Sequence, residues 1–459
     1  IDARDDGHLW AEIYDRELTV ENVFAIQSEI STAIANALQA AVSPETAQRL
    51  ATVPTRDLQA YDLYLRAALT MADVDGEFID VVNQASRAVE LDPGFGAAWA
   101  LLSHAQSRMY WDSREPRWRD QALASAERAM ALAPGESESH LAMGFYHYWG
   151  HLDYGPALQA FTLAQKLAPG APTPVRAMAY VQRRMGLFEE SLANFKRAVQ
   201  LDPRNLGNLV EVVEYLRVLR RNEEAQEYLQ RCRELGVESD YLEMEAGQVA
   251  QELRGDTAAY RAGAERIRPD LGYVGFHRFR ARYLQRDFDA ALEGLAEVNA
   301  QVLSYQYFYY PADLLAGLAH LARNDADAAR DSFERAVDRL NRDNAARSSD
   351  PRLRAALGIA LAALGQKDEA IRHGAKATEL LPYSKDALDS LWYVYDLAHI
   401  HLLNGDLGQA LVHLETVVSR PGEVGTEAAF QDPIWDRYRS DARFVELERK
   451  YRRAGRAPE

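Results

Sequence analysis

A short junction, leucine followed by any residue and then proline, recurs along this chain and constrains its fold more than any other feature. The prolines of these junctions are Pro93, Pro134, Pro169, Pro203 and, far downstream, Pro382. Successive steps between the first four are 41, 35 and 34 residues. Because proline cannot continue a helix, each junction marks a corner between two helical units. A period of this length is typical of repeat proteins whose small units stack side by side.

Small and aromatic residues fall at fixed offsets within each unit. In residues 172–205, Ser191 and Phe195 lie on the second of two expected helices, and Ala198 lies one turn later. The corresponding residues of the unit 310–343 are Gly317, Ala329, Phe333 and Ala336. Small residues at these places let two antiparallel helices approach closely, and the aromatic residue fills the gap toward the next unit.

This pattern resembles the tetratricopeptide repeat, or TPR, a family of helix–turn–helix units of about 34 residues. The resemblance predicts an all-α fold, an α-solenoid of about ten TPR units preceded by a short strand–helix segment. The predicted domains are a strand-plus-helix remnant at residues 1–56, a TPR superhelix at 57–420 and a C-terminal capping segment at 421–459. The units at residues 240–300 match poorly, and the second unit carries an insertion around residues 111–118.

The N-terminal residues have a different periodicity. Leu9, Ala11 and Ile13 alternate with other residues, which predicts a short strand, and residues 22–42 predict a helix. This pair resembles the last part of a TolB-amino-terminal-like α/β domain, which in bacteria often precedes TPR arrays. The run 432–444 also resembles the closing segment of such proteins. The resemblance implies part of a bacterial signalling protein, with an adenylate cyclase, a CadC-like winged helix or a kinase upstream.

The composition argues against several classes of function. The chain has 69 acidic and 52 basic side chains and a formal charge of −17, whereas nucleic-acid binding needs a basic surface. No run of about 18 apolar residues occurs, so we expect no membrane segment. The one cysteine, Cys232, excludes an internal disulfide and a cysteine-rich zinc site, and it fits either the cytoplasm or the periplasm. Since no signal-peptide pattern follows Ile1, we expect the chain to begin inside a longer protein or to be a processed form.

No motif for catalysis or cofactor binding stands out. His147 and His151 are four residues apart and could share a metal ion, but no HExxH motif or cysteine lies near them, and packing among aromatic neighbours accounts for both. The chain has neither a G-x-S-x-G elbow nor a glycine-rich phosphate loop. Cys232 occupies the small buried position of its repeat. We therefore predict no enzyme, no catalytic residue, no metal and no cofactor.

The TPR resemblance implies a binding surface, because the first helices of such units line the concave face of the solenoid. Positions on this face carry tyrosine, tryptophan and arginine, the residue types that dominate binding hot spots. They are Phe145, Tyr148, Trp149, Arg176, Tyr180, Arg183, Arg184 and Arg217. The sequence thus predicts a non-enzymatic scaffold that binds a peptide or protein in its groove, with arginines for acidic groups. The alternative is that the aromatic side chains pack between repeats and the arginines pair with local glutamates.

Two further alternatives stay open at this point. The chain could be a structural protein that self-assembles end to end, either through an uncapped solenoid end or through its N-terminal strand. The aromatic run from Tyr305 to Tyr310 could be a recognition surface or a plug between repeats, and we favour the plug.

Overall fold

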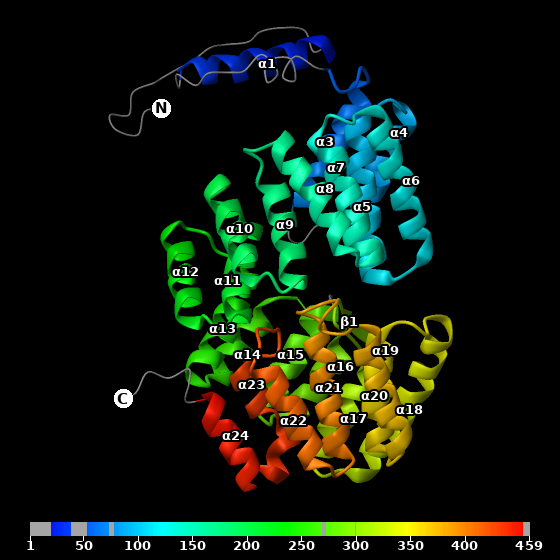
Figure 1. Cartoon of the computed structure of the whole chain (residues 1–459), viewed down its shortest axis with the longest axis vertical. Coiled ribbons are helices and arrows are strands. Elements are labelled where there is room, and N and C mark those ends of the chain that lie inside the picture. The colour runs from blue at the N-terminus through cyan, green and yellow to red at the C-terminus, as the bar shows by residue number, and fades with distance from the viewer. Residues whose placement is uncertain (1–19, 38–52, 73–77, 269–271, 299, 453–459) are drawn as a thin grey trace. The chain divides into compact units, whose positions relative to one another are not determined.

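The computed structural model describes residues 20–37, 53–72, 78–268, 272–298 and 300–452. Nearly all elements in these ranges are helices, and consecutive helices pair as hairpins (Figure 1). This confirms the predicted all-α solenoid class. The contacts divide the chain into two compact units, which we name unit 1 (Ile1–Pro169) and unit 2 (Gly170–Glu459). The predicted domain boundaries at residues 56 and 420 stay predictions.

Unit 1 contains one separate helix and three hairpins among its described residues. The separate helix, α1 (Val20–Ala37), lies where the sequence predicts one, whereas the predicted strand around Leu9 falls outside the described residues. The hairpins are α3 (Leu58–Ala72) with α4 (Phe78–Leu91), α5 (Gly96–Ser113) with α6 (Pro116–Leu132), and α7 (Ser137–Phe145), continued by the π-helical turn η1 (Tyr146–His151), with α8 (Tyr154–Leu167).

Unit 2 contains seven hairpins among its described residues and then a C-terminal segment. The hairpins are α9 (Pro172–Arg184) with α10 (Phe188–Leu201), α11 (Leu206–Val218) with α12 (Asn222–Glu234), α13 (Asp240–Arg254) with α14 (Thr257–Arg266), α15 (Gly272–Leu284) with α16 (Phe288–Glu297), α17 (Ala312–Ala322) with α18 (Ala326–Ala346), α19 (Pro351–Ala363) with α20 (Lys367–Leu380), and α21 (Ser390–Leu403) with α22 (Leu407–Val418). The segment comprises α23 (Thr426–Gln431), the 3-10 helix η2 (Pro433–Tyr438) and α24 (Ala442–Arg452). Among the described helices of both units, none combines the length and the apolarity needed to cross a membrane.

A glycine of the first helix lies against the aromatic residue of the second helix of the same hairpin in both units. A Cβ atom added to Gly144 would lie 2.3 Å from the ring of Phe161, and one added to Gly317 would lie 2.6 Å from the ring of Phe333. Both rings are fully buried. Only a residue without a side chain lets the second helix of the hairpin press a phenyl ring onto the backbone of the first.

Departures from the 34-residue step have local structural causes in unit 1. The step of 35 residues between Pro134 and Pro169 contains η1, and a π-helical turn accommodates one residue more than an α-helical turn. The step of 41 residues between Pro93 and Pro134 contains α5 and α6, with 18 and 17 residues against 13 and 14 in α9 and α10. The insertion therefore lengthens both helices of one hairpin by about one turn each.

The poorly matching unit at α13 and α14 replaces the aromatic contact by two glycines. A Cβ on Gly247 would lie 2.5 Å from the backbone oxygen of Ala259, and one on Gly263 would lie 2.5 Å from that of Glu243. The two helices therefore cross with their backbones in direct contact. The hairpin geometry is retained although the sequence pattern is lost.

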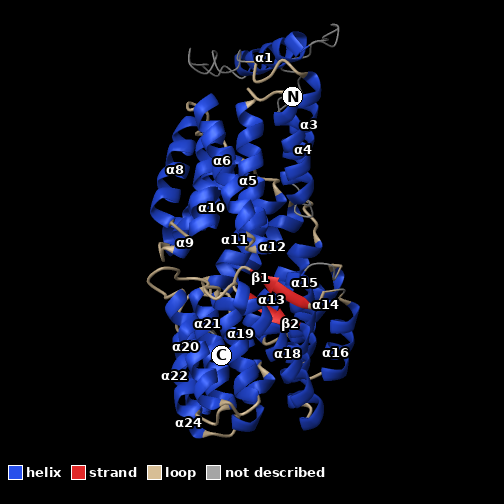
Figure 2. Cartoon of the chain, turned by 90° about the vertical axis from the view of Figure 1, so that its right-hand side faces the viewer, coloured by secondary structure: helices blue, strands red, loops and turns tan. Residues whose placement is uncertain are grey.

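The aromatic run before α17 forms a buried β-hairpin. Strand β1 (Val302–Tyr305) pairs antiparallel with β2 (Phe308–Pro311), and both are drawn in red among the helices of unit 2 in Figure 2. The hairpin contacts α15 and α19, and Phe308 is 1% exposed. The rings of Tyr307 and Phe308 pack against Trp392, with centroids 4.7 and 6.2 Å away. The structure confirms that this run is a plug between repeats.

Candidate functional site

The aromatic residues predicted for the groove in unit 1 lie together on first helices. The ring of His104 stacks on Phe145 and Trp149, with centroid distances of 3.8 and 5.5 Å, and the rings of Phe145 and Trp149 are 4.6 Å apart. The guanidinium carbon of Arg108 lies 5.6 Å from the ring centroid of Trp149 and 4.8 Å from that of Phe78. We call His104, Arg108, Phe145 and Trp149 the unit 1 stack. It places a cation on aromatic faces, an arrangement stabilised by the ring quadrupole.

Tyr148, the third predicted aromatic residue of unit 1, packs beside this stack. Its ring lies 6.2 Å from that of Trp111, and the guanidinium carbon of Arg114 lies 4.1 Å from the Trp111 ring centroid. Phe145, Tyr148 and Trp149 are themselves only 2%, 2% and 7% exposed. A partner could therefore reach this surface mainly through the half-buried His104, Arg108 and Arg114.

The π-helical turn η1 carries one residue of the stack, Trp149, and its neighbour Tyr148. It ends at Leu152 in the left-handed region with φ of 52°. Phe145 and Trp149 are four residues apart, a spacing that makes side chains neighbours on one helix face, and their rings lie against each other. Turns of the π-helical kind occur frequently at functional sites.

In unit 2, three of the predicted groove residues bind side chains of the next first helix, α11. Arg176 donates to the Asn208 side-chain oxygen at 3.1 Å, and the Tyr180 hydroxyl donates to Glu211 at 2.7 Å. Arg183 lies 3.6 Å from Glu211 and is 5% exposed. These contacts join neighbouring repeats, which is the alternative that the sequence left open.

Arg184 is fully buried and binds residues about 200 positions further along the chain. It forms ion pairs with Asp386, at 3.2 Å, and with Asp389, and it donates to the side-chain oxygen of Gln306 in the plug at 2.7 Å. The backbone N–H of Ala387 donates to its carbonyl oxygen at 2.8 Å. Arg184 therefore links α9 to the loop before α21.

Arg217, on α11, is buried in a second network of this kind. Its Nε lies 3.0 Å from Glu245 on α13, and its Nη2 lies 3.3 Å from Glu423. Burial by itself lowers the pKa of Arg217, but Glu245 and Glu423 outweigh it and hold the pKa well above its usual value. Burial raises the pKa of the neighbouring Glu214 well above its usual range, and the charges of Glu423 and Glu211 add to the effect.

The segment after α22 completes this closure of unit 2. The N–H of Gly422 donates to the carbonyl of Val218 at 3.1 Å, and the carboxylate of Glu252 on α13 accepts from the N–H groups of Glu427 and Ala428 at 3.1 and 3.2 Å. Figure 1 shows α23 beside α13 and α14, although about 170 residues separate them. The first helices α9, α11 and α13 thus bind the C-terminal part of their own chain.

The eight predicted groove residues consequently divide into two sets. Phe145, Tyr148 and Trp149 pack together in unit 1. The five of unit 2 are engaged by side chains of the same chain, and Arg183, Arg184 and Arg217 among them are buried. The structure therefore offers an open edge at the unit 1 stack and a closed, ion-paired interior at the arginines of unit 2.

Several other titratable groups are buried in the interior of unit 2. Burial raises the pKa of Asp396 to about 7 and that of Asp389 to about 6. The Tyr310 hydroxyl donates to Asp396 at 2.8 Å. A small cavity of about 50 Å³ lies beside Asp396, His399 and Asp432, and burial lowers the pKa of His399. These groups lie among close-packed aromatic rings, so the cavity has room for about one water molecule or two.

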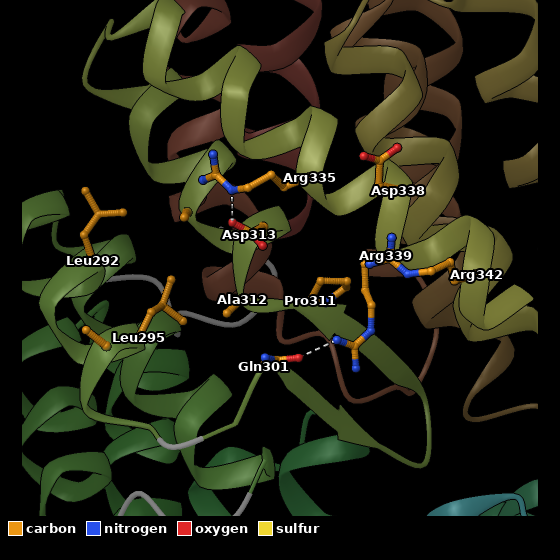
Figure 3. Close-up of a pocket in the computed structure, with 12 residues that line it drawn as sticks. Leu292, Leu295, Gln301, Pro311, Ala312, Asp313, Arg335, Asp338, Arg339 and Arg342 are labelled. Carbon is orange, nitrogen blue, oxygen red and sulfur yellow. Dashed lines mark hydrogen bonds and ion pairs between the residues drawn. The ribbon is translucent and has the colours of Figure 1, made fainter.

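A larger pocket lies between α16, α17 and α18 and was missed by the sequence analysis (Figure 3). It has a volume of about 470 Å³. Three arginines of α18, namely Arg335, Arg339 and Arg342, line it with apolar residues of α16 and α17. Their spacing of four and three residues places them on one helix face. This spacing is visible in the sequence and could have predicted the cluster of arginines.

The histidine pair considered for a metal ion has other contacts. His151 Nε2 lies 2.8 Å from the hydroxyl oxygen of Tyr146, and the pKa of His147 is lowered by burial. Within the described ranges, no group of three or more histidine, cysteine, aspartate or glutamate side chains is arranged to hold a metal ion.

The repeat pattern also matches known proteins. Residues 177–205, which comprise most of α9 and α10, match the family model described as tetratricopeptide repeat. This hairpin of the chain is therefore similar to a tetratricopeptide repeat. Tetratricopeptide repeat protein 5 of Bos taurus is 33% identical over 100 residues, which cover 21% of this chain and 22% of that protein.

A bacterial relative bears the name of an enzyme. A protein of Rhizobium meliloti named as an adenylate cyclase is 31% identical over 153 residues, which cover 32% of this chain and 26% of the relative. The matches therefore span about a quarter of the length of these curated relatives. Among solved structures, the Cut9 and Hcn1 complex of the APC/C aligns with a TM-score of 0.44 at 17% identity, covering 79% of this chain and 61% of that one. The type IV pilus biogenesis factor PilW aligns with a TM-score of 0.35 at 17% identity, covering 46% and 93%.

Proposed function

We propose that this TPR chain is a non-enzymatic scaffold that binds a peptide or protein partner at the unit 1 stack. The observation that carries the proposal is the stack itself, formed by residues of the first helices of two consecutive repeats: Arg108 lies on the ring of Trp149, and His104 lies on Phe145. Aromatic side chains and arginine in one rigid patch are typical of binding hot spots. One of the rings, that of Trp149, belongs to the π-helical turn η1, and such turns occur frequently at functional sites.

The proposal assigns different roles to the two sets of predicted groove residues. Phe145, Tyr148 and Trp149 form the rigid base of the surface, and His104 and Arg108 form its accessible edge. Arg176, Tyr180, Arg183, Arg184 and Arg217 hold unit 2 together. A partner could reach Arg184 or Arg217 only by breaking ion pairs in which both side chains are buried.

The bacterial relative supports a place in signalling. Its name refers to a cyclase, whereas the match covers 26% of its length. We propose that the present chain supplies the docking part of such a protein and that a catalytic domain, where one exists, lies elsewhere in the polypeptide or on the partner.

A peptide selection tests the proposed surface. A displayed library of random dodecapeptides is selected on the full chain, and selected peptides are titrated by fluorescence anisotropy. The double variant His104→Ala/Arg108→Ala should weaken binding roughly tenfold or more, because it removes the polar edge of a hot-spot patch. The control Arg87→Ala changes an exposed arginine of α4 that pairs with Glu90. Equal affinity for the double variant and the control would reject the surface.

Self-association is a second candidate function, favoured by one specific observation. Leu58, Leu65 and Leu69 on α3, the first helix of the repeat array, are 38%, 41% and 73% exposed. At the other end, α24 buries Phe444 fully against Trp435 and Phe430. With one end capped, two copies would pair through α3 as a closed dimer rather than grow into a filament.

Measuring the molar mass of the protein in solution tests the proposed self-association. Light scattering after gel filtration should show a dimer at high concentration, and Leu65→Ser/Leu69→Ser should convert it to a monomer. A wild-type chain that stays monomeric at the highest soluble concentration removes the candidate.

A further inference from the structure

The pocket between α16, α17 and α18 has one wall that is cationic and another that is aliphatic. Arg335, Arg339 and Arg342 come from a single face of α18 (Figure 3). The opposite wall and floor consist of Leu292, Leu295, Ala296, Ala312 and Ala316. The volume of about 470 Å³ lies within the range of ligand pockets, roughly 300–1,000 Å³.

The three arginines differ in what they already bind. Arg335 pairs with Asp313 at 2.8 Å. Arg339 uses Nε for Asp343, at 2.9 Å, and Nη1 for the side-chain oxygen of Gln301, at 2.6 Å. Arg342 is exposed, and no carboxylate of the described residues lies within ion-pairing distance of it.

A free arginine beside a prepositioned one is suited to a carboxylate. A guanidinium offers N–H donors in a planar fork, and a carboxylate binds two of them at once. In this pocket Asp313 is neutralised by Arg335, and of the lining carboxylates only Asp338 remains without such a pair among the described residues. Arg335 is offset by Asp313 and Arg339 by Asp343, so Arg342, one turn from Asp338, is the arginine of this wall that has no ion-paired carboxylate among the described residues.

The aliphatic wall limits the class of acid further. A small inorganic anion would leave Leu292, Leu295 and Ala316 in contact with water, whereas a leucine-sized side chain would cover them. Since the rest of the chain repels acidic partners, and charges more than about 10 Å away are largely screened at 0.1 M salt, a short acidic segment fits better than an extended acidic surface.

We propose that this pocket binds a short peptide segment of a partner protein in which an aliphatic side chain is followed by acidic ones. The aliphatic side chain enters between α16 and α17, and a carboxylate binds Arg342 and the remaining donor of Arg339. This deepens the proposed scaffold function and rests on it, but it concerns a second surface, distinct from the unit 1 stack.

Fluorescence anisotropy with defined peptides tests the pocket on the full chain. The probe is a labelled octapeptide with an amidated C-terminus that contains Leu-Glu-Glu, and its analogues contain Leu-Gln-Gln or Ala-Glu-Glu. Arg342→Glu should weaken binding of the probe at least about tenfold, because a charge-assisted pair becomes a repulsion. Ala296→Phe, at an exposed lining position, should weaken binding by filling the pocket.

The matched control is Arg330→Glu, which reverses an exposed arginine of the same helix outside the pocket and should change the affinity less than about twofold. Each of three results would overturn the proposal: equal affinity for Arg342→Glu and Arg330→Glu, equal affinity for the Leu-Glu-Glu and Leu-Gln-Gln peptides, or no binding up to about 1 mM. Binding of a Leu-terminated peptide through its free carboxylate alone would overturn it as well. The selection on the unit 1 stack uses other variants and other peptides, so the two proposals fail separately.

Discussion

The first helices of unit 1 and unit 2 carry the same kinds of side chain and use them differently. In unit 1 the cation Arg108 lies on aromatic rings and pairs with Asp112 one turn away, at 3.2 Å. In unit 2 the cation Arg184 is fully buried and pairs with Asp386, about 200 residues later. An arginine on a first helix therefore stays half-buried at the surface in the described part of unit 1, and becomes a core group in unit 2, where a later part of the chain approaches it with carboxylates.

This difference has an energetic consequence. A half-buried arginine on an aromatic face, paired with one carboxylate at the surface, contributes little to stability. A buried arginine and its two carboxylates together contribute little net stability. Removing one of these three side chains, however, leaves an uncompensated charge in the interior. Unit 2 should thus be sensitive to changes at its arginines, whereas unit 1 should tolerate them.

The largest expected effect comes from breaking the buried set in unit 2. Arg184→Ala should lower the free energy of unfolding of unit 2 by about 3–5 kcal/mol, because Asp386 and Asp389 lose their counter-charge. Chemical denaturation followed by circular dichroism, with hydrogen exchange to assign the transition to unit 2, measures this loss. The triple variant Arg184→Met/Asp386→Asn/Asp389→Asn should recover most of it. If the single and triple variants are equally unstable, the loss comes from packing and not from charge.

A smaller, pH-dependent effect concerns the interior acid Asp396. Burial raises its pKa to about 7, so the folded state binds the proton more tightly than the unfolded state. The proton therefore stabilises the folded state fully at a pH below the pKa of aspartate in the unfolded chain, near 4. This stabilisation is lost as the pH rises through 7. The side chain of the variant Asp396→Asn cannot ionise, and its oxygen can still accept the hydrogen bond from Tyr310. The free energy of unfolding of the variant minus that of the wild type should therefore be about 2 kcal/mol larger at pH 8 than at pH 5.

Denaturation curves of the wild type and Asp396→Asn at both pH values give this difference. His399 lies nearby and titrates in both proteins, so its effect on the free energy of unfolding largely cancels in the difference between them. The same gain at pH 5 and pH 8 would contradict a raised pKa at Asp396.

Next in size is a pair of substitutions that tests what the two units share. Gly144→Ala in unit 1 and Gly317→Ala in unit 2 each place a methyl group against a buried phenyl ring, of Phe161 and Phe333. Each should lower the free energy of unfolding of its own unit by about 1–3 kcal/mol, since overpacking forces the ring to move. Exposed Gly155, which has open space around it, is the control. If only one of the two variants lowers the free energy of unfolding of its unit, the glycine–phenylalanine contact is not equivalent in the two units.

The smallest effect is expected for the cation of unit 1. Arg108→Ala should lower the free energy of unfolding by no more than about 1 kcal/mol, because its side chain keeps access to water and its pairing with Asp112 is screened there. Thermal denaturation of the same variant used for peptide binding measures it. A loss as large as that of Arg184→Ala would remove the distinction between the two units.

Much of the fold follows from the sequence because repeat packing is local. Gly317, Phe333 and the junction prolines predict hairpins from residues that lie within one repeat of each other. The candidate site was predictable only where it is local as well. Phe145 and Trp149 meet within one turn of helix. Carboxylates that pair with Arg184 and Arg217 lie about 200 residues later in the sequence, and they come within reach only because the stacked repeats of unit 2 curve.

The sequence by itself determined the hairpin repeat, the places of its small and aromatic residues and the residue types on the first helices, because each depends on neighbours within one or two repeats. Only the tertiary structure decided which of those arginines are surface groups and which are core groups. The physical reason is that small rotations between successive repeats add up along unit 2 until α23 meets α13, and no single period of the sequence records that sum.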